Sequence, residues 1–155
     1  MDWALFFTFL AACIPAAISG ALFRPGEWYA GLSKPSWTPP NWLFPIVWLT
    51  LYVCMAWAAA RVANLPDTSQ ALAFWTVQIA FNTLWSGIFF GLRNMAAGGI
   101  IIGMLWIAVC TTMIAFWQHD QTAGLLFVPY LVWVTLAFAL NWSVWASNRK
   151  PAWPQ

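Results

Sequence analysis

The stretch Lys34-Pro35-Ser36-Trp37-Thr38-Pro39-Pro40-Asn41-Trp42 runs straight into Leu43-Phe44-Pro45-Ile46-Val47-Trp48 and joins two long apolar segments. It holds four prolines within eleven residues, at positions 35, 39, 40 and 45. Proline fixes φ and removes a backbone donor, so this connection should be stiff and partly extended. A stiff loop loses little conformational entropy when it is ordered over a ligand. We therefore predict that loop 24–41 is a lid over a pocket supplied by the apolar segments.

The composition indicates an integral membrane protein. Charged residues make up 6% and hydrophobic residues 63% of the 155 residues, against roughly 25% and 45–50% in soluble domains. Ten charged side chains cannot cover the surface of a soluble domain of this size. The net charge of +2 is too small to indicate a nucleic-acid partner.

Five segments are long and apolar enough to cross a bilayer, which takes about 20 residues of helix. They are residues 3–23, 42–62, 71–90, 96–117 and 123–145. The connections after the first are short, so neighbouring helices should run antiparallel. The sequence predicts an all-α integral membrane protein, an up-down bundle of five transmembrane helices that forms one domain over residues 1–155.

Basic residues predict the orientation of this bundle. Five of the six lie on one side of the predicted membrane, and the sixth, Arg61, lies on the other; the five are Arg24, Lys34, Arg93, Arg149 and Lys150. The positive-inside rule then places the first loop and the C-terminus on the cytoplasmic side and the N-terminus outside. Which membrane holds the protein stays open.

Polar and aromatic residues recur at helical spacing inside the predicted spans, which places them on shared faces. The faces are Phe44, Trp48, Tyr52 and Met55; Gln78, Asn82, Trp85 and Phe89; and Tyr130, Trp133, Ala137 and Asn141. In a membrane such side chains turn inward. Converging aromatic walls with a few amides and hydroxyls are typical of a small-molecule site. The alternative is that the amides only form hydrogen bonds between helices.

Two GxxxG motifs, Gly87–Gly91 and Gly99–Gly103, allow close helix contact. They favour packing within the bundle and a homodimer seam equally.

The residues that conventional catalysis or metal binding needs are scarce. His119 is the only histidine, and Cys13, Cys54 and Cys110 lie in three separate segments. We therefore predict no catalytic residue, no metal site and no tightly bound cofactor. Binding, sensing or facilitated passage of a large apolar ligand remains.

Several of these stretches resemble the TspO/MBR family, which comprises the translocator protein (formerly the peripheral-type benzodiazepine receptor) and the bacterial tryptophan-rich sensory proteins. The resemblance covers residues 15–148 and is strongest over residues 28–42, with further matches at Pro45-Ile46-Val47-Trp48, Phe81-Asn82, Pro129-Tyr130-Leu131-Val132-Trp133 and Leu140-Asn141-Trp142-Ser143-Val144-Trp145. It implies a homodimeric bacterial receptor or transporter that binds porphyrins such as protoporphyrin IX under the first loop, with a regulatory role in tetrapyrrole metabolism or stress. It also implies an alternative, an enzyme that degrades the porphyrin in a light-dependent or oxidative reaction with its pocket tryptophans.

The family's pocket residues correspond to eight positions: Trp37 and Trp42 in the loop, and Trp48, Tyr52, Asn82, Trp85, Trp133 and Ala137 in the helices. One departure concerns sterols. The family's cholesterol pattern needs a tyrosine and a nearby basic residue on the last helix, where this chain has Trp142 and Ala146. We therefore expect weak or no sterol binding.

Overall fold

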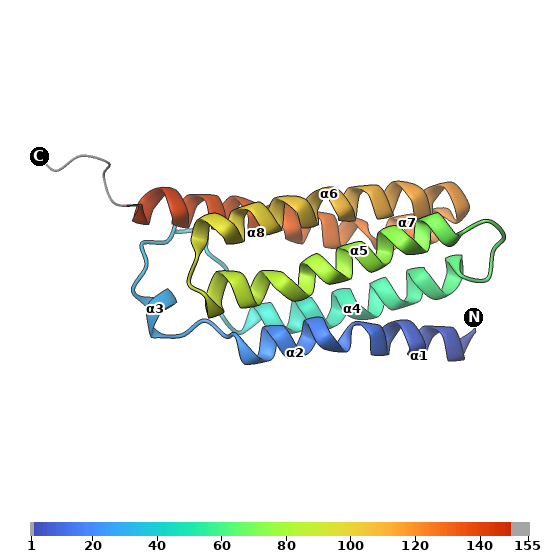
Figure 1. Cartoon of the computed structure of the whole chain (residues 1–155), viewed down its shortest axis with the longest axis horizontal. Coiled ribbons are helices and arrows are strands. Elements are labelled where there is room, and N and C mark those ends of the chain that lie inside the picture. The colour runs from blue at the N-terminus through green and yellow to red at the C-terminus, as the bar shows by residue number, and fades with distance from the viewer. Residues whose placement is uncertain (1, 150–155) are drawn as a thin grey trace, which may run out of the picture.

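The computed structural model describes residues 2–149, and Lys150, which we counted among the basic residues, lies outside that range. The described part is helical, without a strand between residues 2 and 149. Its elements are α1 (Trp3–Ala12), α2 (Ile14–Leu22), α3 (Glu27–Ala30), α4 (Leu43–Val62), α5 (Ser69–Ser86), the π-helix η1 (Gly87–Gly91), α6 (Met95–His119), α7 (Gln121–Leu126) and α8 (Val128–Asn148). The long helices lie side by side in an elongated bundle, with α3 at one end (Figure 1).

Two of the long helical segments are interrupted near a proline. α1 passes into α2 at Cys13, and Pro15 follows in the first turn of α2. α7 passes into α8 at Phe127, and Pro129 follows in the same way. Proline cannot donate to the carbonyl four residues earlier and its ring crowds that carbonyl, so the helix breaks while the chain keeps its direction.

Four helical segments are long and apolar enough to cross a membrane: Trp3–Leu22, Leu43–Val62, Met95–His119 and Gln121–Asn148. Large apolar side chains on them remain exposed, among them Leu22 (72%), Ile107 (62%) and Val132 (65%). Such a surface suits lipid and not water. The protein is therefore an all-α integral membrane protein.

The predicted count of five spans is not met by these four segments. The predicted segment 71–90 is helical, as α5 and η1, but Gln78 and Asn82 make it less apolar than the others. Both side chains are buried. α5 packs against α6 and α2, so its polar groups lie inside the bundle.

Both glycine motifs make contacts within the chain. A Cβ atom at Gly91 would lie 2.8 Å from the Phe23 ring, and one at Gly99 would lie 3.2 Å from Nδ2 of Asn141. Of the two roles left open by the sequence, these contacts favour packing inside the bundle.

The predicted lid loop contains a turn of helix, α3, so it is less extended than its prolines suggest. Lys34 closes this turn: its Nζ donates to the carbonyl oxygens of Tyr29 (2.7 Å), Ala30 (3.1 Å) and Leu32 (2.9 Å). The same ammonium group lies 4.9 Å from the centre of the Tyr29 ring. Burial raises the pKa of the Tyr29 hydroxyl.

The loop is also attached to the end of α8. The backbone N–H of Ser33 donates to Oδ1 of Asn148 (2.9 Å), and Nδ2 of Asn148 donates to the carbonyl oxygen of Ser33 (2.9 Å). The Asn148 amide donates in addition to the carbonyl oxygen of Val144 (2.7 Å), which holds it against its own helix. The loop is therefore ordered across the end of the bundle.

Candidate functional site

A chain of buried hydrogen bonds connects α4, α5 and α8. The Tyr52 hydroxyl donates to Oδ1 of Asn82 (3.3 Å), and Nδ2 of Asn82 donates to the Tyr130 hydroxyl (2.8 Å). The Tyr130 hydroxyl donates to Oε1 of Gln78 (2.9 Å), whose Nε2 lies 3.6 Å from the sulfur of Met55. These bonds are the inter-helix interactions that the sequence left as an alternative to ligand binding. They fix the positions of Tyr52 and Asn82, two of the eight predicted site residues.

Aromatic rings surround this chain on the side of the loop. Trp48 is stacked on Tyr52, with ring centroids 5.9 Å apart, and meets the Tyr130 ring edge-on at 6.0 Å. Trp133 packs edge-on against Phe44 at 5.4 Å. The structure therefore brings Trp48, Tyr52 and Asn82 together through direct contacts, with Tyr130 between them.

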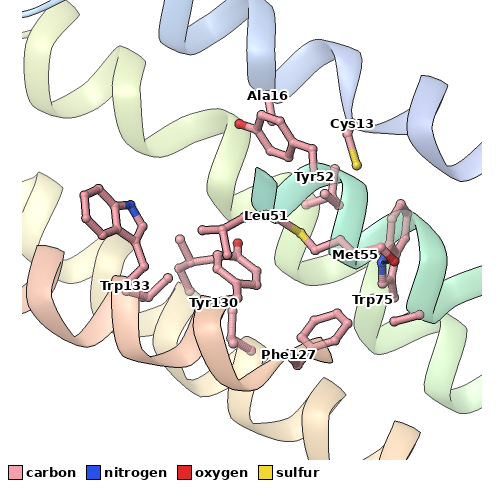
Figure 2. Packing of buried hydrophobic residues seen from close by; sticks show 14 of the residues in the cluster. Cys13, Ala16, Leu51, Tyr52, Met55, Trp75, Phe127, Tyr130 and Trp133 are labelled. Atoms are coloured by element: carbon pink, nitrogen blue, oxygen red, sulfur yellow. Dashed lines mark hydrogen bonds between the residues drawn. The ribbon is translucent and has the colours of Figure 1, made fainter. Parts of the chain in front are cut away.

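Trp85 and Trp133 are nine-tenths buried, with 7% and 8% exposed, yet their indole N–H groups have no hydrogen-bond partner within residues 2–149. Trp85 is stacked on Phe89 at 5.5 Å. In Figure 2 the indole nitrogen of Trp133 faces the cluster that contains Tyr130 and Leu51. A buried donor without a partner costs about 1–3 kcal/mol, so these two N–H groups mark positions where a ligand acceptor would be stabilised.

The remaining three predicted residues make no side-chain hydrogen bond or aromatic contact with the cluster in the described part of the chain. Ala137 is buried and follows Trp133 by one turn of α8. Trp37 is 46% and Trp42 is 65% exposed. Neither of these two rings forms an aromatic pair with another residue in the described range. The two loop tryptophans are thus exposed at the surface.

Tyr130 belongs to this cluster, although the predicted set of eight omits it. Its ring is fully buried and its hydroxyl joins the two amides of α5. The sequence carried a signal for it, because Tyr130, Trp133 and Ala137 share one helical face.

Two cavities in the described part of the chain are lined by none of the eight predicted residues. One, of about 310 Å³, is an open apolar groove between α5 and α6 lined by residues such as Phe74 and Met104. The other, of about 220 Å³, is polar and lies near the start of α3. The rings of Trp48, Tyr52 and Tyr130 pack against one another, so a large ligand at this position would have to displace some of them.

An ion pair lies at the other end of the bundle. Nε of Arg61 donates to Oδ2 of Asp120 (2.6 Å), and Oδ1 of Asp120 accepts from the backbone N–H of Thr122 (2.8 Å). Partial burial raises the pKa of Asp120, but these donors outweigh it and hold the pKa below its ordinary value of 3.8. In the part of the chain that the structure describes, no three His, Cys, Asp or Glu side chains are grouped as metal ligands would be.

Comparison with known proteins adds the family. Residues 4–146 match the TspO/MBR family. The chain is 53% identical to the "Tryptophan-rich sensory protein" of Cereibacter sphaeroides, over 96% of this chain and 94% of the relative. It is 51% identical to "Protein CrtK" of Rhodobacter capsulatus (97% and 98%) and 39% identical to the human "Translocator protein" (84% and 82%).

Proposed function

The chain belongs to the TspO/MBR family, and we propose that it is a membrane receptor or transporter that binds a porphyrin between α4, α5 and α8. The observation that carries this proposal is the pair of buried indole N–H groups on Trp85 and Trp133 that lack partners within residues 2–149. A flat ring bearing carboxylate or nitrogen acceptors matches both the donors and the aromatic walls. Regulation of tetrapyrrole metabolism or of stress would follow from such binding.

We propose in addition that α5 and η1 form a fifth membrane span. α5 and η1 together run over residues 69–91, which at 1.5 Å per residue is roughly 34 Å, enough to cross the hydrocarbon core. Their polar side chains, Gln78 and Asn82, are buried, whereas Val77 (46%) and Leu84 (50%) are exposed. The hydrophobic face thus points outward. The positive-inside rule then places the loop and the end of α8 on the cytoplasmic side.

Binding on this scheme requires the loop to move and the aromatic rings to separate, with Trp37 and Trp42 contacting the ligand afterwards. We propose a homodimer whose seam uses a surface other than the two glycine motifs, because both motifs pack inside the chain. The replacement of the family's tyrosine by Trp142 supports weak or no sterol binding.

Titration with protoporphyrin IX, followed by quenching of tryptophan fluorescence, tests the proposal. Trp85→Phe and Trp133→Phe keep an aromatic ring but remove the N–H together with part of the indole, and each should weaken binding about tenfold if the acceptor is a carboxylate. Trp106→Phe is the matched control, because its N–H already donates to Oγ1 of Thr135 (2.8 Å) and its ring is 38% exposed. Unchanged isotherms for Trp85→Phe and Trp133→Phe would show that the pocket lies elsewhere.

A porphyrin-degrading enzyme is the second candidate. It is favoured by the position of Trp48, which contacts both Tyr52 and Tyr130 and could donate an electron to a photoexcited ring. Illumination of the complex followed by mass spectrometry distinguishes the two. Recovery of intact porphyrin would exclude degradation and leave the receptor proposal standing.

A further inference from the structure

The polar cavity of about 220 Å³ lies apart from the indole site, where α2 ends, α3 begins and η1 passes into α6. Its walls are Arg24, Gly26, Glu27, Trp28, Phe90 and Arg93. Figure 1 shows these three junctions at the same end of the bundle. The cavity is smaller than the roughly 300–1,000 Å³ of pockets for drug-sized ligands, so it suits a small polar group and not a macrocycle.

Both arginines have donors available for a ligand. Arg24 uses its Nε to donate to the carbonyl oxygen of Ala21 (2.8 Å), which leaves the N–H groups of its two terminal nitrogens for a ligand. Between residues 2 and 149 the one ion pair is Arg61 with Asp120, at the opposite end of the bundle. The other basic residue of the loop, Lys34, is occupied by the carbonyls of the α3 turn.

The backbone around Arg93 is held on both sides. The N–H of Leu92 donates to the carbonyl oxygen of Gly87 (2.8 Å), and Asn94 caps α6 by accepting from the N–H of Ala97 (3.0 Å). Between them Arg93 has a φ of 53°, in the left-handed region. Its position beside the cavity is therefore set by its neighbours.

The cavity lies at the border between apolar and polar surface. Leu22 is 72% and Leu92 is 74% exposed, and each precedes one of the two cavity arginines by one or two residues. In a membrane protein this border lies at the level of the lipid headgroups. A headgroup in the cavity would leave its acyl chains along these exposed leucines.

The charges indicate which headgroup fits. Two guanidinium groups can both donate to one phosphodiester. An anion without a positive group would be repelled by the Glu27 carboxylate, which also lines the cavity. An ammonium group on the same ligand would pair with Glu27 and pack on the face of Trp28. We propose that this cavity binds the zwitterionic headgroup of a phospholipid, with the phosphate between Arg24 and Arg93 and a primary ammonium at Glu27.

Native mass spectrometry of the full-length protein in detergent tests this proposal, with phosphatidylethanolamine and phosphatidylglycerol of identical acyl chains as probes. We expect the ethanolamine lipid to be retained about tenfold better by the wild-type protein, since only it offers a partner to Glu27. Glu27→Gln should abolish that preference. Arg24→Gln and Arg93→Gln should lose retention of both lipids. Equal retention of the two lipids by the wild type would overturn the proposal.

Two variants separate binding from folding and from net charge. Arg93→Gly should be at least as stable as the wild type, because glycine adopts φ of 53° without strain, and it should still lose the lipid. Arg149→Gln removes the same charge near the same end of the bundle, where its guanidinium packs on Trp145, and should leave retention unchanged. Full retention by Arg93→Gly would refute the site.

Two further measurements fix the identity of the ligand. Soluble phosphorylethanolamine at micromolar concentration should not displace the lipid, and displacement would show that the site serves a free phosphate compound instead. Trp133→Phe should leave lipid retention unchanged. Lipid binding at the cavity and porphyrin binding at the indole site are therefore tested separately.

Discussion

The two hydrogen bonds between Ser33 and Asn148 should control how readily the loop opens. Asn148→Ala removes both of them and leaves the α8 backbone intact. A net contribution of about 0.5–1.5 kcal/mol per bond gives a combined range of about 1–3 kcal/mol. Both bonds are exposed, so we take the low end, which corresponds to about a fivefold larger open population.

Hydrogen exchange measures this opening. The Ser33 amide should exchange about fivefold faster in Asn148→Ala, and porphyrin should associate faster by a similar factor if loop opening limits access. The substitution also removes the bond from Asn148 to the carbonyl oxygen of Val144. The melting temperature should still change little, because the Val144 side chain stays buried and Asn141 keeps its bond to the carbonyl oxygen of Met95.

The matched control is Asn64→Ala. Asn64 donates from Nδ2 to the carbonyl oxygen of Ala60 (3.0 Å), four residues back on its own helix, as Asn148 does to Val144, but it lies at the other end of the bundle. It should leave Ser33 exchange unchanged. If Asn148→Ala also leaves it unchanged, the loop is held by its prolines and α3, and the reasoning from the Asn148 bonds is wrong.

Two further predictions concern other parts of the molecule. The folded-state pKa of Asp120 is lowered from 3.8, so the stability that its ionised form supplies should be complete above about pH 4 and lost as the pH falls through the lowered value. Thermal unfolding between pH 6 and pH 3 measures this loss, and Asp120→Asn, which keeps a capping side chain, should flatten the dependence of the melting temperature on pH. Tyr130→Phe should lower the free energy of unfolding by about 2 kcal/mol, because it leaves buried groups of Asn82 and Gln78 without partners. Tyr52→Phe removes only one bond, of 3.3 Å, and should lower the free energy of unfolding by less in the same assay. Equal losses would contradict the central role of Tyr130.

The helix faces were predictable because they depend on local spacing alone. Tyr52, Asn82 and Trp133 share an interior with Trp48 as their periodicity indicates, and the membrane class follows from composition. The four segments found as spans also follow from apolar length, whereas α5 is less apolar because Gln78 and Asn82 replace lipid contacts with internal hydrogen bonds.

The loop was harder to predict because its structure depends on distant or tertiary contacts. Ser33 and Asn148 are separated by 115 residues, and no local pattern connects them. Lys34 is one of the basic residues that predict the orientation, but its ammonium group is bound by carbonyls that converge only once α3 has formed. The exposed positions of Trp37 and Trp42 likewise depend on how the loop crosses the bundle and not on residue type.

The chain of hydrogen bonds from Tyr52 to Gln78 has a fixed polarity, since each group donates to the next. A ligand that accepts the hydrogen bond of the Tyr52 hydroxyl would leave Oδ1 of Asn82 without its donor. A ligand donor to the same hydroxyl would leave every downstream bond in place. A ligand donor at the Tyr52 hydroxyl therefore keeps the bond to Asn82, whereas a ligand acceptor there costs that bond, so the interior of the bundle favours ligands that donate at this position.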